Sequence, residues 1–171
     1  MSALTAKIEV ARKDDNVIQH KVAAVKIYEG ALCKMNAAGF LAPCSAELGA
    51  VFAGVAIDQK DNSSGAAGDL KARIYKEGIF LLTGSGFAQT DVGQAVYATD
   101  DQTITKTNAA DKQRVGVIVE FESSTQVWVK IMPHVLGLEA HIADATDAAS
   151  AITQLNLALA VMRKHKMVSE S

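Results

Sequence analysis

Between Val17 and Ile131 the chain consists of short runs of β-forming residues, separated by clusters of glycine, asparagine, aspartate and serine. Runs rich in valine, isoleucine, tyrosine and phenylalanine between such clusters predict strands. The predicted strands are Val17–Val25, Ala31–Met35, Val51–Asp58, Lys71–Tyr75, Ile79–Leu82, Ala95–Ala98, Thr103–Thr107, Arg114–Phe121 and Gln126–Ile131. Many short strands at this spacing predict a mainly β fold, a compact barrel or sandwich of short antiparallel strands over residues 17–133.

The last predicted strand shows the alternation most clearly. Val127, Val129 and Ile131 share one face because side chains alternate along a strand. Trp128 falls on the other face, so we expect it to meet a neighbouring element or a partner chain.

Two strands carry an internal glycine in similar surroundings, Gly54 in Phe52–Ile57 and Gly116 in Val115–Val119. A glycine within a strand often marks a bulge or a close approach of another backbone. We therefore expect both glycines to be structural.

Composition excludes several classes of protein. The formal net charge is −2 and the sequence pI is about 6.1, which disfavours nucleic acid as the main partner. No run is apolar and long enough for a membrane span or a signal peptide, so we expect a soluble protein without membrane contact. The two cysteines, Cys33 and Cys44, flank a probable turn at residues 36–39 and could approach each other across a hairpin. Two free thiols in a reducing compartment are the favoured interpretation.

The two ends of the chain differ from the β region. Residues 1–16 are predicted to be an extended arm or an edge strand that could pair with another segment, because Ile8 and Val10 alternate with Lys7 and Glu9. Residues 134–143 are predicted to be a linker.

A helix is predicted over residues 144–167, with Asp144 as its N-cap. Its apolar residues follow heptad spacing and are Ala145, Ala148, Ile152, Leu155, Leu159 and Met162. The helix either packs against its own barrel or forms a short bundle with copies of itself, and the pattern leaves both open.

Candidates for chemistry are few. Asp100 and Asp101 lie between two β-forming runs, where aspartate favours turns, so we interpret them as the exposed corner of a hairpin rather than a catalytic pair. His134 and His141 flank the linker and offer an alternative ion site on a symmetry axis. We expect no catalytic, cofactor-binding or metal-binding residues, no cofactor and no enzymatic activity. An enzyme with an unrecognised site remains an alternative.

The order of these features resembles the head decoration (capsid cement) proteins of tailed bacteriophages. The segments that carry the resemblance are Asn16–Ile18, Ala23–Ala24, Gly30–Leu32, Phe52–Ala56, Gly68–Asp69, Gly78–Phe80, Gly93–Tyr97, Val115–Val119 and Val127–Ile131. The stretch Asn156–Arg163 is similar to the helical tails of some phage head-fibre proteins.

The resemblance implies a β-barrel protomer that forms a homotrimer on the outer capsid surface at three-fold or pseudo-three-fold sites. Such a protein binds the major capsid protein and stabilises the head against internal DNA pressure. It is made in the host cytoplasm and ends in the virion. The arm residues Lys7, Ile8, Glu9 and Val10 are the expected capsid contact. Trp128, Ile152, Leu155, Leu159 and Met162 are the expected trimer interface. The alternative is a head-fibre protein that attaches to a host surface or a glycan.

Overall fold

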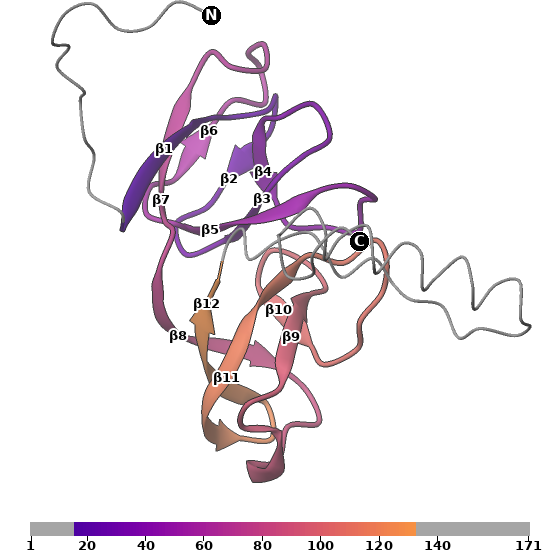
Figure 1. The fold of residues 1–171 in the computed structure, drawn as a ribbon. Coiled ribbons are helices and arrows are strands. Elements are labelled where there is room, and N and C mark those ends of the chain that lie inside the picture. Colours follow the sequence, from indigo (N-terminus) through magenta and orange to yellow (C-terminus); the bar gives the residue numbers. More distant parts are fainter. Residues whose placement is uncertain (1–15, 133–171) are drawn as a thin grey trace, which may run out of the picture. The chain divides into compact units, whose positions relative to one another are not determined.

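The computed structural model describes residues 16–132, which form a mainly β structure (Figure 1). All of them belong to the first of two units into which the chain divides, Met1–Pro133. The arm residues Lys7, Ile8, Glu9 and Val10 lie outside the described residues. So do the predicted linker and helix, with His134, His141, Ile152, Leu155, Leu159 and Met162.

The first half of the described chain forms a five-stranded antiparallel sheet in the order β1-β7-β5-β3-β4. Its strands are β1 (Val17–Lys21), β3 (Leu32–Met35), β4 (Leu41–Pro43), β5 (Val51–Ala56) and β7 (Lys71–Tyr75). A parallel bridge between Val22 and Leu41 joins the end of β1 to β4, so the sheet curls toward closure. Two further short strands, β2 (Lys26–Ile27) and β6 (Lys60–Asp61), pair with each other.

The second half forms a closed barrel in the order β10-β8-β12-β11-β9. Its strands are β8 (Gly78–Gly84), β9 (Ala95–Ala98), β10 (Thr103–Thr105), β11 (Arg114–Ser123) and β12 (Gln126–Ile131). A 3-10 turn, η1 (Gln89–Asp91), precedes β9. The expectation of antiparallel strands throughout is wrong for one pair of strands, because β10 pairs with β8 in parallel. This pair closes the barrel between strands that are distant in the sequence.

The predicted strands agree closely with the observed ones. The bounds of β7, β9 and β12 are those predicted, and the other six predictions overlap an observed strand. The prediction Val17–Val25 is too long, because the chain leaves β1 at Lys21 and turns before β2. The short strands β2, β4 and β6 were not predicted.

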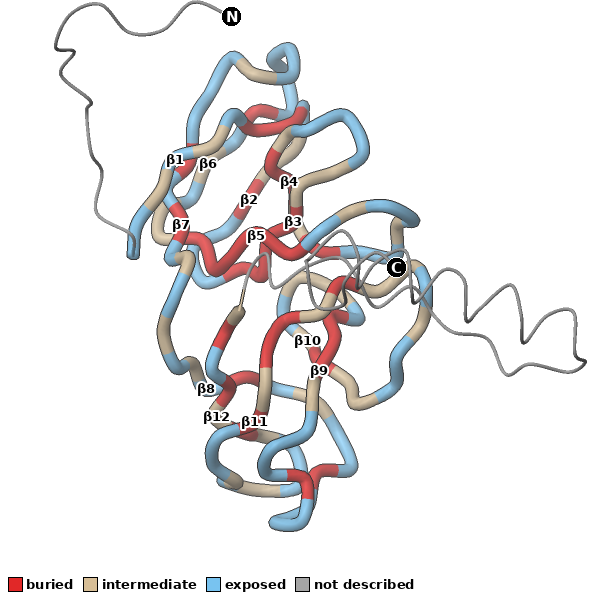
Figure 2. Tube along the Cα trace, viewed as in Figure 1, coloured by how far each residue is buried: buried red, intermediate tan, exposed pale blue. Residues whose placement is uncertain are grey.

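Two apolar clusters form the core, and one of them joins the barrel to the sheet (Figure 2). Val127, Val129 and Ile131 are at most 2% exposed and fill the barrel, which confirms that they share one face of β12. The same cluster contains sheet residues, namely Leu32, Cys44, Phe52 and Val55. The second cluster lies within the sheet around Val22, Ile27 and Ile74.

The structure confirms the role predicted for the two strand glycines. A Cβ atom at Gly116 would collide with the backbone oxygen of Lys130, and one at Gly54 would collide with that of Tyr75. A register shift lies beside each glycine, between Arg114 and Gly116 and opposite Gly54 in β3. Both glycines therefore permit close backbone approach at an irregularity of the sheet.

Candidate protein-binding surface on the barrel

The outward side chains of β8, β12 and β11 form one surface, which we call the barrel face. Alternate residues of these strands fill the interior, so the residues between them point outward. In the strand register, Leu81 lies opposite Trp128 and Trp128 lies opposite Glu120. One row further, Lys130 lies between Ile79 and Val117.

Three large aliphatic side chains on this surface are exposed. Ile79 is 56% exposed, Leu81 is 40% exposed and Val119 is 39% exposed. Val119 lies at a register shift of β11, where the extra residue is displaced from the regular pairing. A group of exposed aliphatic side chains beside a tryptophan is typical of protein–protein contact surfaces.

Trp128 lies at the centre of the barrel face and is half-buried. Its indole Nε1 donates a hydrogen bond to Glu122 Oε2 over 3.2 Å. The ring is thereby held in place with its polar atom paired, while its apolar part borders Leu81. Tryptophan in such a position is a common anchor in interfaces. The structure thus places Trp128 on the face of β12 opposite Val127, Val129 and Ile131, as predicted. Its part in a trimer stays a prediction.

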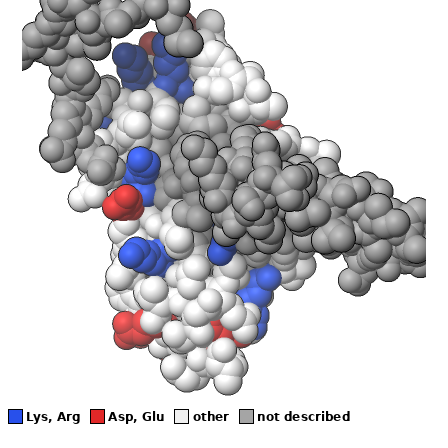
Figure 3. All heavy atoms as spheres, viewed as in Figure 1, with Lys and Arg blue, Asp and Glu red and all other residues white. Residues whose placement is uncertain are grey.

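The charges around this surface are mixed. Lys130 and Glu120 are both exposed and lie on adjacent rows of the barrel face. On the described part of the face drawn in Figure 3, basic and acidic side chains are likewise interspersed with uncharged ones. A mixed surface of this kind fits a protein partner better than a polyanion such as nucleic acid.

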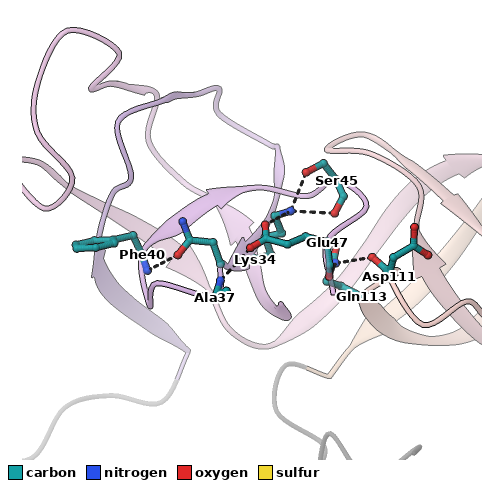
Figure 4. A network of polar contacts seen from close by, with 8 residues as sticks. Lys34, Ala37, Phe40, Ser45, Glu47, Asp111 and Gln113 are labelled. Atoms are coloured by element: carbon teal, nitrogen blue, oxygen red, sulfur yellow. Dashed lines mark hydrogen bonds and ion pairs between the residues drawn. The ribbon is translucent and has the colours of Figure 1, made fainter. Parts of the chain in front are cut away.

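A buried lysine holds the loop between β4 and β5 against the rest of the sheet (Figure 4). Lys34 Nζ donates to Ser45 O over 2.9 Å and to Ser45 Oγ over 2.7 Å, and it lies 2.7 Å from Glu47 Oε2. The Glu47 carboxylate also accepts a hydrogen bond from the Ala37 N–H. The hydrogen bond from Lys34 is the main reason that the pKa of Glu47 is lowered.

The same loop is bonded to the barrel through its backbone. Glu47 N–H donates to Asp111 O over 2.9 Å, and Gln113 Nε2 donates to Glu47 O over 3.3 Å. Lys34 has three acceptors around its ammonium group, so its charge is compensated within the fold. We interpret this network as structural, because it joins the sheet to the start of β11.

Asp100 and Asp101 form the turn of the β9–β10 hairpin, as predicted. Asp100 Oδ1 accepts hydrogen bonds from the N–H groups of Gln102 and Thr103 over 2.9 and 2.7 Å. Asp101 contributes its backbone oxygen, which accepts a hydrogen bond from Leu32 N–H over 2.7 Å. Both residues are half-buried, so the expectation of a fully exposed corner is wrong. The contact with β3 covers the turn on that side.

Both cysteines are free and buried. Cys33 pairs with Pro43 across the β3–β4 hairpin, so it lies opposite the residue that precedes Cys44. Burial raises the pKa of Cys33 to about 12 and raises that of Cys44 as well. Neutral, buried thiols are weak nucleophiles, which favours a packing role for both.

Sequence reasoning missed the aliphatic part of the barrel face. Ile79, Leu81 and Val119 were not singled out, although the run Ile79–Leu82 places apolar side chains on both faces of one strand. That signal also fits a strand covered on both sides, so it does not by itself indicate exposure.

Within residues 16–132 no group of three or more His, Cys, Asp or Glu side chains is arranged to hold a metal ion. Across the same residues no helix is long and apolar enough to cross a membrane. Comparisons of the chain with protein-family models, with curated proteins and with solved structures found no match.

Proposed function

We propose that this chain is a non-enzymatic decoration protein of a tailed-bacteriophage capsid, which binds as a homotrimer to the outer surface at three-fold or pseudo-three-fold sites. It binds the major capsid protein and stabilises the head against internal DNA pressure. The observation that carries the proposal is the barrel face, where Trp128 lies opposite the exposed Leu81 and one row from the exposed Ile79.

The barrel face supports self-association for a physical reason. Burying the exposed aliphatic side chains against another protein removes apolar area from water, which stabilises the complex by about 25 cal/mol per Å². Trp128 is already oriented by Glu122, so little side-chain entropy is lost when it is covered.

The closed barrel also suits a protein that carries mechanical load. Its strands are hydrogen-bonded around the ring, and backbone bonds from Leu32 and Glu47 join it to the neighbouring sheet. In the proposal, three rigid subunits bind one capsid site together. Modest contacts made by each copy then combine into tight binding through multivalency.

The arm completes the proposal. Residues Lys7, Ile8, Glu9 and Val10 would add a strand to an open edge of the capsid protein, which supplies backbone hydrogen bonds. The heptad residues Ile152, Leu155, Leu159 and Met162 would form a helical bundle on the three-fold axis, where tethering to the barrels raises their effective concentration.

The test combines solution mass with capsid binding. Light scattering measures the mass of the full chain and of a chain that ends at Gly137. The full chain should be a trimer. Purified protein should then bind saturably to virions of the phage that encodes it, after any resident copies have been removed, and should raise the temperature at which they release DNA. Saturable binding that is lost when residues 1–15 are deleted supports the arm contact. Virions that neither bind the protein nor gain heat resistance contradict the proposal.

A further inference from the structure

One edge of β8 is open along its first part. Gly84 N–H donates to Thr125 O, in the same register that pairs β8 with β12. Backbone groups of alternate residues point to the same neighbouring strand, so Ile79 and Leu81 direct their N–H and C=O groups away from β12. Strand β10 pairs with that side only from Thr83 onward. No strand in the described part of the chain pairs with the edge at Ile79 and Leu81.

A second open edge of the same length lies on β1. Lys76 N–H donates to Asn16 O, in the register that pairs β1 with β7. By the same alternation, Val17 and Gln19 direct their backbone groups away from β7. Beyond them, Val22 already bridges to β4. Among residues 16–132 no strand covers the edge at Val17 and Gln19.

The two edges are complementary in one antiparallel register. If Gln19 lies opposite Ile79, then Val17 lies opposite Leu81, and the Lys21 side chain lies near Glu77 at the bend that precedes β8. This register pairs the outward backbone groups of both strands. It also sets two exposed apolar side chains together, Val17 at 38% exposed and Leu81 at 40% exposed. Lys21 and Glu77 are exposed and opposite in charge, so the two side chains attract each other across the junction.

We propose that the open edge of β8 in one copy of this chain pairs with the open edge of β1 in a second copy. Exposed edges with apolar side chains invite pairing with another chain, and natural proteins usually cover or blunt them. Here each edge offers the backbone groups, the apolar contact and the charge that the other requires. The partner is therefore a second copy of this chain.

The proposed contact is heterologous, because it joins two different surfaces. Such contacts form closed rings when the rotation between copies closes, and open filaments when it does not. This inference rests on the proposed homotrimer, for which it supplies the subunit contact beside the barrel face. It requires a ring of three in which each copy gives one β8 edge and one β1 edge.

A cysteine pair tests the register directly. In the variant Gln19→Cys/Ile79→Cys, the paired Cα atoms would lie about 5.5 Å apart, within the range that a disulfide spans. The native Cys33 and Cys44 are buried and do not compete. Brief treatment of the full-length protein with a mild oxidant should give a covalent trimer on a non-reducing gel, and each single variant should stay uncrosslinked. Dimers from Ile79→Cys alone would indicate pairing between two β8 strands and overturn the proposal.

Charge reversal gives a second test that leaves the fold of each copy unaltered, since both side chains are exposed. Lys21→Glu and Glu77→Lys should each weaken association about threefold to tenfold, because like charges then lie near each other. The double variant should restore most of it. Sedimentation equilibrium on the wild type and the three variants measures the four dissociation constants. Equal effects in the single and double variants would overturn the register.

The outcomes separate this inference from the decoration proposal. A trimer in solution that neither crosslinks at positions 19 and 79 nor responds to charge reversal refutes the edge contact and leaves the trimer standing. A protein that stays monomeric at all concentrations refutes the edge contact, and virion binding then decides the decoration proposal alone.

Discussion

Gly116 is the single residue whose replacement should disturb the barrel most directly. An added Cβ would meet the backbone of Lys130, which cannot move without shifting β12. We expect Gly116→Ala to lower the free energy of unfolding by about 3 kcal/mol. Gly86→Ala is the matched control, because Gly86 has a φ of +69° but no atom within 4 Å of an added Cβ. Its cost should be about 1 kcal/mol. Urea denaturation of both variants measures the difference, and equal costs would contradict the close approach.

Lys34 should contribute more to the free energy of unfolding at neutral pH than in acid. Replacing it by methionine leaves Glu47 without the hydrogen bond that lowers its pKa, and should cost about 2 kcal/mol near pH 7. A lowered pKa gives stability that is present above the ordinary value of 4.5 and is lost as the pH falls toward the folded value. The difference between wild type and Lys34→Met should therefore shrink between pH 5 and pH 3. Urea titrations at these pH values test this, and a constant difference would refute the pairing.

The thiols of Cys33 and Cys44 should be inert in the folded protein. Their pKa values are raised by burial, to about 12 for Cys33, so almost no thiolate forms at pH 8. We expect Ellman's reagent to label neither cysteine within minutes under native conditions and both in 6 M guanidinium chloride. The variant Ser64→Cys, which places a cysteine at an exposed loop position away from the proposed contact, serves as a positive control. Rapid labelling of the wild type under native conditions would contradict the prediction, because it would show that reagent reaches the buried thiols.

At the scale of elements, the β9–β10 hairpin depends on one aspartate of its turn. Asp100 accepts two backbone hydrogen bonds through its side chain, whereas Asp101 contributes its backbone oxygen. Asp100→Ala should lower the free energy of unfolding by about 1 kcal/mol, because two N–H groups lose their acceptor. Asp101→Ala keeps the backbone bond to Leu32 and should cost clearly less. Thermal or urea unfolding of the two alanine variants distinguishes them, and the reverse order would contradict the turn geometry.

The elements show where sequence reasoning succeeds. Strands such as β7 and β12 alternate between buried and exposed side chains, so their pattern alone gives their bounds. Strands β2 and β6 contain two residues each and β4 contains three, which is too short for a period to appear. The parallel pairing of β10 with β8 depends on how the barrel closes, so no local sequence pattern could predict it.

The candidate surface was predictable only in part for a related reason. The alternation of β12 placed Trp128 on the face opposite Val127 and Val129, and in the structure that face points out of the barrel. Whether Ile79 and Leu81 are covered depends on the strands beside β8. The sequence of β8 itself carries no information about which strands lie beside it.

At the scale of the whole molecule, Trp128 offers a built-in report on assembly, because it is the one tryptophan in the sequence. If copies associate through the barrel face and the adjacent β8 edge, the indole is covered on association and exposed to water on dilution. Its fluorescence maximum should therefore move to longer wavelength as the protein is diluted from about 100 µM to about 0.1 µM, a range that spans the affinities of ordinary reversible complexes.

Leu81→Glu places a charge opposite Trp128 and should hold the maximum at the long-wavelength position at every concentration. Gln126→Glu is the matched control, because it adds the same charge to β12 away from the aliphatic residues. A maximum that stays constant on dilution while light scattering records dissociation would show that the copies associate through a surface other than the barrel face.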